Sequence, residues 1–246
     1  MASPYWHNKI VLGVTRTGKT TDEIRELQAQ DDVMRFFINS KNEDCWDQYC
    51  GFNNVTRRRK FDPLDTIEWA YENEERFKKA GIINLRATDI KDPYTELANC
   101  IDLIFEKHFE DNLKETILFI DEIYEFQSKR GLGKTIRRCF GQGLGIGLSM
   151  VIAAHRSSQV HNDLMASAEI KKSHLLTWND LDSHVCKFMR FQEYVAEQGW
   201  EWSPKVIDQL FPITALDRKA EVPVSHRSYI QNGSSEKIAI YRFKKR

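Results

Sequence analysis

Short apolar runs alternate along the chain with charged stretches whose apolar residues recur at helical spacing. The runs are typical of strands buried on both faces and lie at residues 10–12, 35–39, 82–85, 116–120, 148–153 and, more weakly, 174–178. The helical spacing is found over residues 20–30, 66–80 and 93–109. Strands that alternate with helices predict an α/β fold with a mostly parallel central sheet flanked by helices.

The pattern changes towards the C-terminus. From Gly199 onward the chain carries Trp200, Trp202 and proline-containing turns, and residues 237–243 alternate like an edge strand. We interpret residues 1–198 as the core domain and residues 199–246 as a C-terminal extension packed on the same domain. An aromatic-rich, irregular segment at 41–65 ends at Asp62-Pro63 and separates two of the expected elements.

The segment between the first strand and the first helix reads Gly-Val-Thr-Arg-Thr-Gly-Lys-Thr. Its two glycines permit a loop whose backbone N–H groups turn inward around an anion at a helix N-terminus. A lysine and a threonine at the end of such a loop can reach the β- and γ-phosphates and a Mg²⁺ ion. The pattern therefore predicts an ATP and Mg²⁺ site. The residues expected to bind nucleotide are Gly13, Val14, Thr15, Arg16, Thr17, Gly18, Lys19 and Thr20, with Lys19 also catalytic and Thr20 a metal ligand.

Two carboxylates follow the apolar run at residues 116–120. Asp121 and Glu122 lie where that strand ends, and the carboxyl ends of parallel strands are where ligands bind. Asp121 is expected to hold Mg²⁺, and Glu122 to polarise a water molecule for attack on the γ-phosphate. A glutamate at this position favours hydrolysis over simple nucleotide binding.

Polar and basic residues lie on both sides of the run at 148–153. His155 and Arg156 follow it, and Arg137 and Arg138 precede it. His155 is placed to contact the γ-phosphate or the attacking water, and so to sense the nucleotide. Arg137, Arg138 and Arg156 are candidates for an arginine finger, which offsets charge during phosphoryl transfer. A surface salt bridge is the alternative for each arginine.

Composition limits how the chain could bind nucleic acid, whether it crosses a membrane and whether its cysteines form disulfides. The 246 residues have a formal net charge of zero, so nucleic acid would have to be bound by local patches such as residues 57–60 or 244–246. No apolar run is long enough to span a membrane and no signal-peptide pattern begins the chain, so we do not expect an integral membrane protein. Five cysteines without a C-x-x-C pair favour free thiols over disulfides or a structural metal site.

With these motifs in order, residues 8–195 resemble the FtsK–HerA branch of additional-strand-catalytic-glutamate ATPases. Within that branch they look most like the genome-packaging ATPases of membrane-containing icosahedral viruses. The resemblance depends on residues 13–20, 37–41, 118–122 and 143–158, and on the turn after 173–178. Family members usually carry Gln and Pro where this chain has His155 and Ser157.

The resemblance implies a three-layer P-loop NTPase fold of the RecA-like type. It also implies a homo-oligomeric ring, hexameric in form, that hydrolyses ATP while threading double-stranded DNA. Capsid or membrane vertex proteins would be further partners, and the virion or host cytoplasm the location. We also keep open a cellular or plasmid DNA pump or helicase, a morphogenesis or secretion ATPase that does not bind DNA, and a nucleotide-dependent switch.

Overall fold

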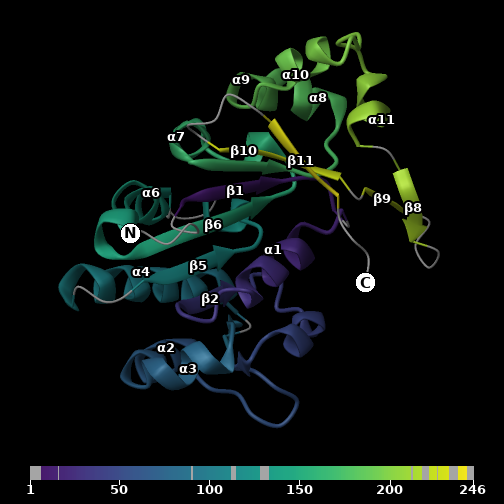
Figure 1. The fold of residues 1–246 in the computed structure, drawn as a ribbon. Helices are drawn as coiled ribbons and strands as arrows, with labels where there is room; N and C mark the ends of the chain where they lie inside the picture. The colour runs from purple at the N-terminus through teal and green to yellow at the C-terminus, as the bar shows by residue number, and fades with distance from the viewer. Residues whose placement is uncertain are drawn as a thin grey trace. The chain divides into compact units, whose positions relative to one another are not determined.

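The computed structural model describes residues 7–15, 17–89, 91–111, 115–127, 133–211, 213–217, 222–225, 227–232 and 238–242. Arg16 of the predicted phosphate loop and the basic residues 244–246 lie outside the described residues. The chain divides into two compact units. Figure 1 labels helices and strands of both units. The first contains residues 1–8 and 22–152, and the second contains residues 9–21 and 153–246.

Five parallel strands form the sheet of the first unit, in the spatial order β6-β5-β2-β4-β3. Every residue of β2, β5 and β6 is buried, because helices cover both faces of a parallel sheet. The strands predicted at 35–39, 82–85, 116–120 and 148–153 are all present. Their bounds are β2 (Met34–Ile38), β3 (Phe52–Asn53), β4 (Ile83–Leu85), β5 (Thr116–Ile120) and β6 (Leu148–Ala154).

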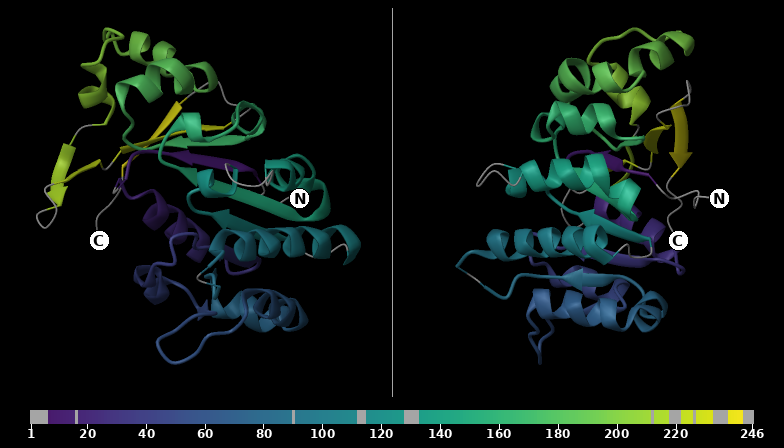
Figure 2. Two further views of the ribbon diagram at one scale, coloured as in Figure 1. Left: turned by 180° about the vertical axis from the view of Figure 1, so that it is seen from behind. Right: turned by 90° about the vertical axis from the view of Figure 1, so that its left-hand side faces the viewer.

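Along the chain, the helices of this unit alternate with its strands, and the longest of them, α4 (Pro93–Asp111), runs alongside the sheet (Figure 2). The predicted helix at 66–80 is instead two helices. It begins earlier, at Pro63, because the Asp62 side chain caps the helix by accepting from two backbone N–H groups. It breaks at Asn73, whose side-chain amide donates to the Trp69 carbonyl at 2.9 Å and competes with the helical pattern.

This region also contains three short helices (η1, α5 and η2) and four longer ones (α2, α3, α4 and α6). The first residues of a further helix, α1, belong to the second unit. The helix bounds are α1 (Lys19–Gln28), η1 (Asp44–Tyr49), α2 (Pro63–Glu72), α3 (Glu74–Ala80), α4 (Pro93–Asp111), α5 (Tyr124–Gln127), α6 (Gly133–Gln142) and η2 (Gly143–Ile146).

The second unit has its own strands, in the order β11-β10-β7-β1. β1 and β7 are parallel, whereas β10 pairs antiparallel with both β7 and β11. The strand bounds are β1 (Lys9–Leu12), β7 (Ile170–Ser173), β8 (Ile213–Asp217), β9 (Val222–Ser225), β10 (Arg227–Asn232) and β11 (Ile238–Arg242). The helices are η3 (Ser157–Gln159), α7 (Asn162–Ser167), α8 (Trp178–Asp180), η4 (Leu181–Val185), α9 (Cys186–Phe188), α10 (Phe191–Glu197) and α11 (Val206–Leu210).

One strand lies earlier in the sequence than expected. The pattern predicted it at 174–178, but β7 occupies Ile170–Ser173 and contains two buried lysines. The ammonium group of Lys171 donates to the Ala168 carbonyl at 2.7 Å, and burial lowers the pKa of Lys171. The pattern of apolar residues cannot reveal a strand whose buried positions are charged.

These elements confirm the predicted α/β fold, in which parallel strands are flanked by helices. The edge strand expected at 237–243 is present as β11. No helix in the described part of the chain is long and apolar enough to cross a membrane. All five cysteines are free thiols, as the composition predicted.

Candidate functional site

The two glycines of the predicted phosphate loop adopt backbone conformations that other residues avoid. Gly13 has φ +154°, and a Cβ atom added there would lie 2.7 Å from the Cβ atom of His174 and 3.0 Å from the hydroxyl of Thr17. Gly18 has φ +87°, in the left-handed region. Glycine is therefore required at Gly13 by close packing and favoured at Gly18 by backbone conformation.

Backbone hydrogen bonds fasten the loop to two other segments of the second unit. The N–H of Gly13 donates to the Ala154 carbonyl at 3.2 Å, and the N–H of Val14 donates to the Leu175 carbonyl at 2.8 Å. Val14 is half-buried, and the helix α1 begins at Lys19, within the last two residues of the motif. The loop thus has the strand-before and helix-after setting that the sequence predicted.

Lys19 is buried within the loop and is held by neutral groups. Its ammonium group donates to the carbonyl of Gly13 at 2.6 Å and to the carbonyl of Val14 at 3.3 Å. It also lies 3.2 Å from Nδ1 of His155, which lies 3.5 Å from the hydroxyl of Thr15. Since an ammonium group can only donate, Nδ1 of His155 accepts this bond.

That bond determines the tautomer of His155, leaving Nε2–H as the donor of a neutral ring. The Gln159 side chain holds the backbone around it, because its amide oxygen accepts from the N–H groups of His155 at 3.1 Å and Arg156 at 3.0 Å. His155 is half-buried and Arg156 is exposed. The predicted sensor residue therefore contacts the predicted phosphate-binding lysine.

His174 packs beneath the loop, fully buried. Its Nδ1 lies 3.1 Å from the carbonyl of Thr17, so Nδ1 carries the proton and donates it. Burial lowers the pKa of His174 well below its ordinary value, and the positive charges of Lys172, Lys19 and Lys9 lower it further. His174 is therefore a neutral support for the loop, surrounded by lysines.

The predicted metal ligand Asp121 lies at the end of β5 in the first unit, with only 4% of its surface exposed. Its backbone is tied to the neighbouring strand β2. The Asp121 carbonyl accepts from the Ser40 hydroxyl at 2.9 Å, and the Asp121 N–H donates to the Ile38 carbonyl at 3.4 Å. Thr20, the other predicted ligand, is half-buried in the second unit. Carboxylate and hydroxyl oxygens are the hard donors that suit Mg²⁺.

Glu122 is buried and has φ +55°, which is uncommon for a residue other than glycine. Its Oε1 lies 2.8 Å from the ammonium group of Lys41. Burial opposes the charge on Lys41, but the hydrogen bond and charge of Glu122, with Asp121 and Glu43, raise the pKa of Lys41. The predicted catalytic carboxylate is thus held in an ion pair.

The candidate arginine fingers have different surroundings. Arg137 and Arg138 are exposed on α6, and the guanidinium carbon of Arg138 lies 4.9 Å from the ring centre of Phe105. This cation–π contact gives Arg138 a role within its own unit. Arg156 is exposed in the second unit.

Sequence reasoning missed three residues of this region. Lys41 and His174 were noted only as parts of longer segments, and Gln159 was not noted. Lys41 follows a predicted buried strand, and that position was a usable signal, since polar residues at strand ends meet ligands. Nothing in the pattern distinguishes His174 or Gln159 from other polar residues.

Comparison with protein-family models and with curated proteins finds no match. Solved structures do match the fold. The genome packaging NTPase B204 from Sulfolobus turreted icosahedral virus 2, in complex with sulfate, has a TM-score of 0.60 and 16% identity, with 96% of each chain covered. Its complex with ATP-gammaS has a TM-score of 0.55 and 14% identity over 96% of each chain.

VirB4 of Thermoanaerobacter pseudethanolicus is a third structural neighbour. Its TM-score is 0.57 at 11% identity, with 97% of this chain and 90% of the VirB4 chain covered. These matches extend over nearly the whole chain and confirm that it has the fold of these NTPase structures. The resemblance noted from the sequence is therefore confirmed as a likeness of fold.

Proposed function

We propose that the protein is an ATPase that binds the phosphates of ATP with residues 13–20. The observation that carries this proposal is the loop itself. Gly13 and Gly18 have the unusual backbone conformations that an anion-binding loop uses, and Lys19 is directed at the carbonyls of that loop. Phosphate oxygens could take the place of those carbonyl acceptors on Lys19.

The chain offers oxygen donors for the Mg²⁺ that accompanies ATP. Thr20 and Asp121 would hold the ion, and their hydroxyl and carboxylate oxygens fit its preference. Bound Mg²⁺ supplies charge neutralisation at the β- and γ-phosphates. His155, with Nε2–H as a donor, is suited to hydrogen-bond the γ-phosphate or the attacking water.

Glu122 is proposed to orient and deprotonate the water that attacks the γ-phosphate. The carboxylate is paired with Lys41 at 2.8 Å, so this role requires the pair to open or to share the water. An arginine from a neighbouring subunit, chosen among Arg137, Arg138 and Arg156, would offset charge in the transition state. Arg138 is the weakest of the three candidates because it already contacts Phe105.

We further propose that hydrolysis drives translocation of double-stranded DNA by a homo-oligomeric ring, hexameric by the resemblance, during packaging of a viral genome. The support is that a genome packaging NTPase matches this fold along 96% of both chains, together with the sequence motifs. Capsid or vertex proteins would be its partners, in the virion or host cytoplasm. The alternative is an ATPase of the same fold that acts without DNA.

The test measures ATP hydrolysis by wild-type protein with and without duplex DNA. We expect measurable turnover that rises when DNA is added. Lys19→Ala should weaken ATP binding about 10- to 100-fold, because hydrogen bonds to a charged group contribute about 1.5 to 3 kcal/mol. Lys205→Ala is a matched control, since this exposed lysine lies far from the loop in sequence.

Turnover that DNA does not change would favour the DNA-independent ATPase. Absence of turnover, with ATP still bound, would favour a nucleotide-dependent switch. Mixing Lys19→Ala chains with Arg137→Ala or Arg156→Ala chains tests the neighbouring-subunit arginine, and partial recovery of hydrolysis would support it.

A further inference from the structure

A short basic hairpin follows the edge strand β3 in the first unit, at residues 54–61. Val55 and Lys60 face each other as an antiparallel bridge, and the N–H of Thr56 donates to the Arg59 carbonyl at 2.8 Å. The Thr56 hydroxyl accepts from the N–H groups of Arg58 at 3.3 Å and Arg59 at 3.1 Å. These bonds define the turn and make it a formed element.

The base of the hairpin is fastened to the end of strand β4. The Asn54 side chain donates to the carbonyls of Phe61 at 3.0 Å and Arg86 at 2.8 Å, and accepts from the Arg86 N–H at 2.8 Å. The Phe61 N–H returns to the Asn54 carbonyl at 2.8 Å. One asparagine therefore joins both ends of the hairpin to the sheet.

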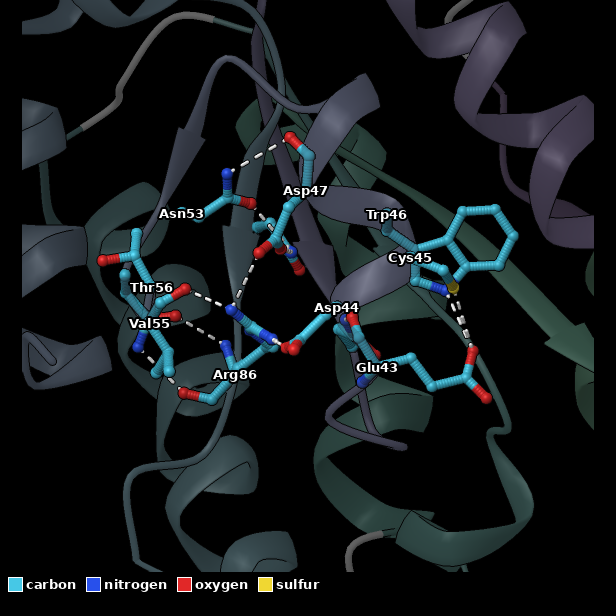
Figure 3. A network of polar contacts seen from close by, with 12 residues as sticks. Glu43, Asp44, Cys45, Trp46, Asp47, Asn53, Val55, Thr56 and Arg86 are labelled. Atoms are coloured by element: carbon cyan, nitrogen blue, oxygen red, sulfur yellow. Dashed lines mark hydrogen bonds and ion pairs between the residues drawn. The ribbon is translucent and has the colours of Figure 1, made fainter. Parts of the chain in front are cut away.

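The side chain of Arg86 adds a second fastening (Figure 3). Its guanidinium group, with only 2% of the residue exposed, donates to the Val55 carbonyl in the hairpin and pairs with Asp44 and Asp47 of η1. The Asp47 carboxylate also accepts from the Asn84 side chain at 3.1 Å. Because the buried charge is paired on one side and bonded to the hairpin on the other, Arg86 links the two segments.

The tip of the hairpin carries four positive charges that this network does not neutralise. Arg57, Arg58, Arg59 and Lys60 are all exposed. Among the residues that the structure describes, no carboxylate forms an ion pair with any of them. In a chain of zero net charge, this concentration of basic side chains makes the hairpin tip a local positive patch that attracts anions.

The arginines differ in their nearest surroundings. Arg57 lines a hollow of about 270 Å³ together with Asp44, Cys45, Asp47 and Gln48, so carboxylates stand on its side of the hairpin. Those carboxylates repel a phosphate and weaken the attraction of Arg57 for it. Arg58 and Arg59 do not line this hollow, and they are better placed to receive the partner.

We propose that the basic hairpin is the element that grips the phosphate backbone of duplex DNA, with Asn54, Thr56 and Arg86 as its positioning residues. This proposal rests on the proposed function and names the DNA-binding site that it requires. Guanidinium groups match phosphate geometry with paired hydrogen bonds. A translocase must hold any sequence, and contacts to phosphates carry no sequence information.

A membrane surface is the competing anionic partner. Binding to a lipid surface normally combines basic residues with apolar side chains that enter the bilayer. The hairpin contains one large apolar side chain, Phe61, which is 44% exposed and whose ring centre lies 6.4 Å from that of Phe52 within the unit. A single aromatic ring in contact with its own unit offers less to a bilayer than several free apolar side chains would. DNA is therefore the partner that the composition of the hairpin favours.

The experiment measures binding of the full chain to duplex DNA of about 30 base pairs and mixed sequence, by fluorescence anisotropy at several salt concentrations. Replacing Arg57, Arg58 and Arg59 together by alanine should reduce the steepness of the log–log salt dependence by about 2 to 3, at about 0.9 per phosphate contact. The matched control replaces Lys79, Lys91 and Lys205 by alanine, which removes three exposed charges elsewhere. This control should keep the wild-type slope.

A second variant tests positioning without any change of charge. Thr56→Ala removes the hydroxyl that shapes the turn and should lower DNA affinity a few-fold, since each lost hydrogen bond costs about 1 kcal/mol. The salt slope should stay near the wild-type value, and Thr56→Ser should restore the affinity. Among single changes, Arg57→Ala should have a smaller effect than Arg58→Ala or Arg59→Ala.

The results separate this proposal from the proposed function. If wild type binds DNA and the triple hairpin variant behaves like the control, the hairpin proposal is overturned and DNA translocation still stands. If wild type does not bind duplex DNA at all, both are overturned. Loss of binding to phosphatidylserine-containing vesicles in the triple variant, with DNA binding unchanged, would identify a membrane partner and also overturn the proposal.

Discussion

Lys19 in the second unit and Glu122 in the first are both buried charges, yet the two units hold them in opposite ways. The ammonium group of Lys19 donates to two carbonyls of its own loop and to one histidine nitrogen, which are neutral acceptors. Glu122 is held by the opposite charge of Lys41. Neutral partners can be exchanged for phosphate oxygens, whereas releasing Glu122 requires two charges to separate. Under the proposed function, this comparison means that the binding residue is ready for phosphate and that the catalytic carboxylate is restrained.

The backbone adds to this difference. The unusual conformation at the phosphate loop falls on glycines, for which it has little cost, but at the acidic strand end it falls on Glu122 itself. A left-handed conformation costs a residue with a Cβ atom about 1 to 2 kcal/mol. Strain of this kind is concentrated at functional positions.

Glu122→Gln should produce the largest effect on activity. The amide keeps the shape of the side chain but cannot accept a proton, so turnover should fall about 10²- to 10⁴-fold while ATP affinity stays close to wild type. Glu106→Gln, an exposed change on α4, is the control. Single-turnover hydrolysis and nucleotide titration measure the two quantities. Wild-type turnover in Glu122→Gln would remove Glu122 as the base.

His155 tests the contact that it makes with Lys19. His155→Ala removes one acceptor from the ammonium group and one N–H donor from the site, so turnover should fall about ten-fold for bonds of this strength. His155→Gln retains both an acceptor and a donor and should keep most of the activity. If both variants hydrolyse ATP like wild type, His155 has no part in sensing.

Lys41 tests the restraint on Glu122. Lys41→Met removes the ion pair while keeping the length of the side chain, and basal turnover should rise about two- to five-fold, the range for a partly exposed pair. ATP affinity should not change, and Lys41→Arg should behave like wild type. A fall in turnover for Lys41→Met would mean that Lys41 positions Glu122 for reaction.

The smallest expected effect concerns the buried histidines, and it is an effect on stability below neutral pH. Burial lowers the pKa of His174 beside Lys19, and also that of His108 in the first unit. Above pH about 6.5 both are neutral whether the chain is folded or unfolded. Below it the unfolded chain gains protons that the folded chain resists, so the free energy of unfolding should fall by up to about 1.4 kcal/mol per pH unit for each histidine.

Urea denaturation at pH values between 7 and 5 measures this loss. His174→Gln and His108→Gln should each make the decline shallower, and His161→Gln, an exposed change, should leave it as it is. An equal decline in all three variants would show that the buried histidines do not cause it. The pair of variants also compares the two units directly.

The sequence predicted the fold well wherever apolar runs were continuous. Residues 116–120 form β5 with the predicted bounds, because a strand buried on both faces must be apolar throughout. The strand predicted at 174–178 lies earlier, as β7, because the buried positions of β7 include Lys171 and Lys172. The break at Asn73 depends on one side-chain hydrogen bond, which helical spacing does not reveal.

In the candidate site, too, the sequence revealed some residues and not others. Residues 13–20 and 121–122 were recognisable because their chemistry is tied to short spacings along the chain. The partners of these residues were not, since the Lys41 pair with Glu122 joins positions brought together only by neighbouring strands. The roles predicted for Arg16 and for residues 244–246 concern positions outside the described residues, and they stay predictions.

The parallel pairing of β1 with β7 has a consequence for biosynthesis. Lys9 lies opposite Ile170, so about 160 residues must be translated between the two strands. At about 5 to 20 residues per second, the phosphate loop waits on the ribosome for about 8 to 30 s before His174 and Leu175 are made. A nascent chain that ends before these residues has no partner for the N–H of Val14 and no support beneath Gly13. The loop is thus translated well before the residues that complete its contacts, and it can take its final shape only after them.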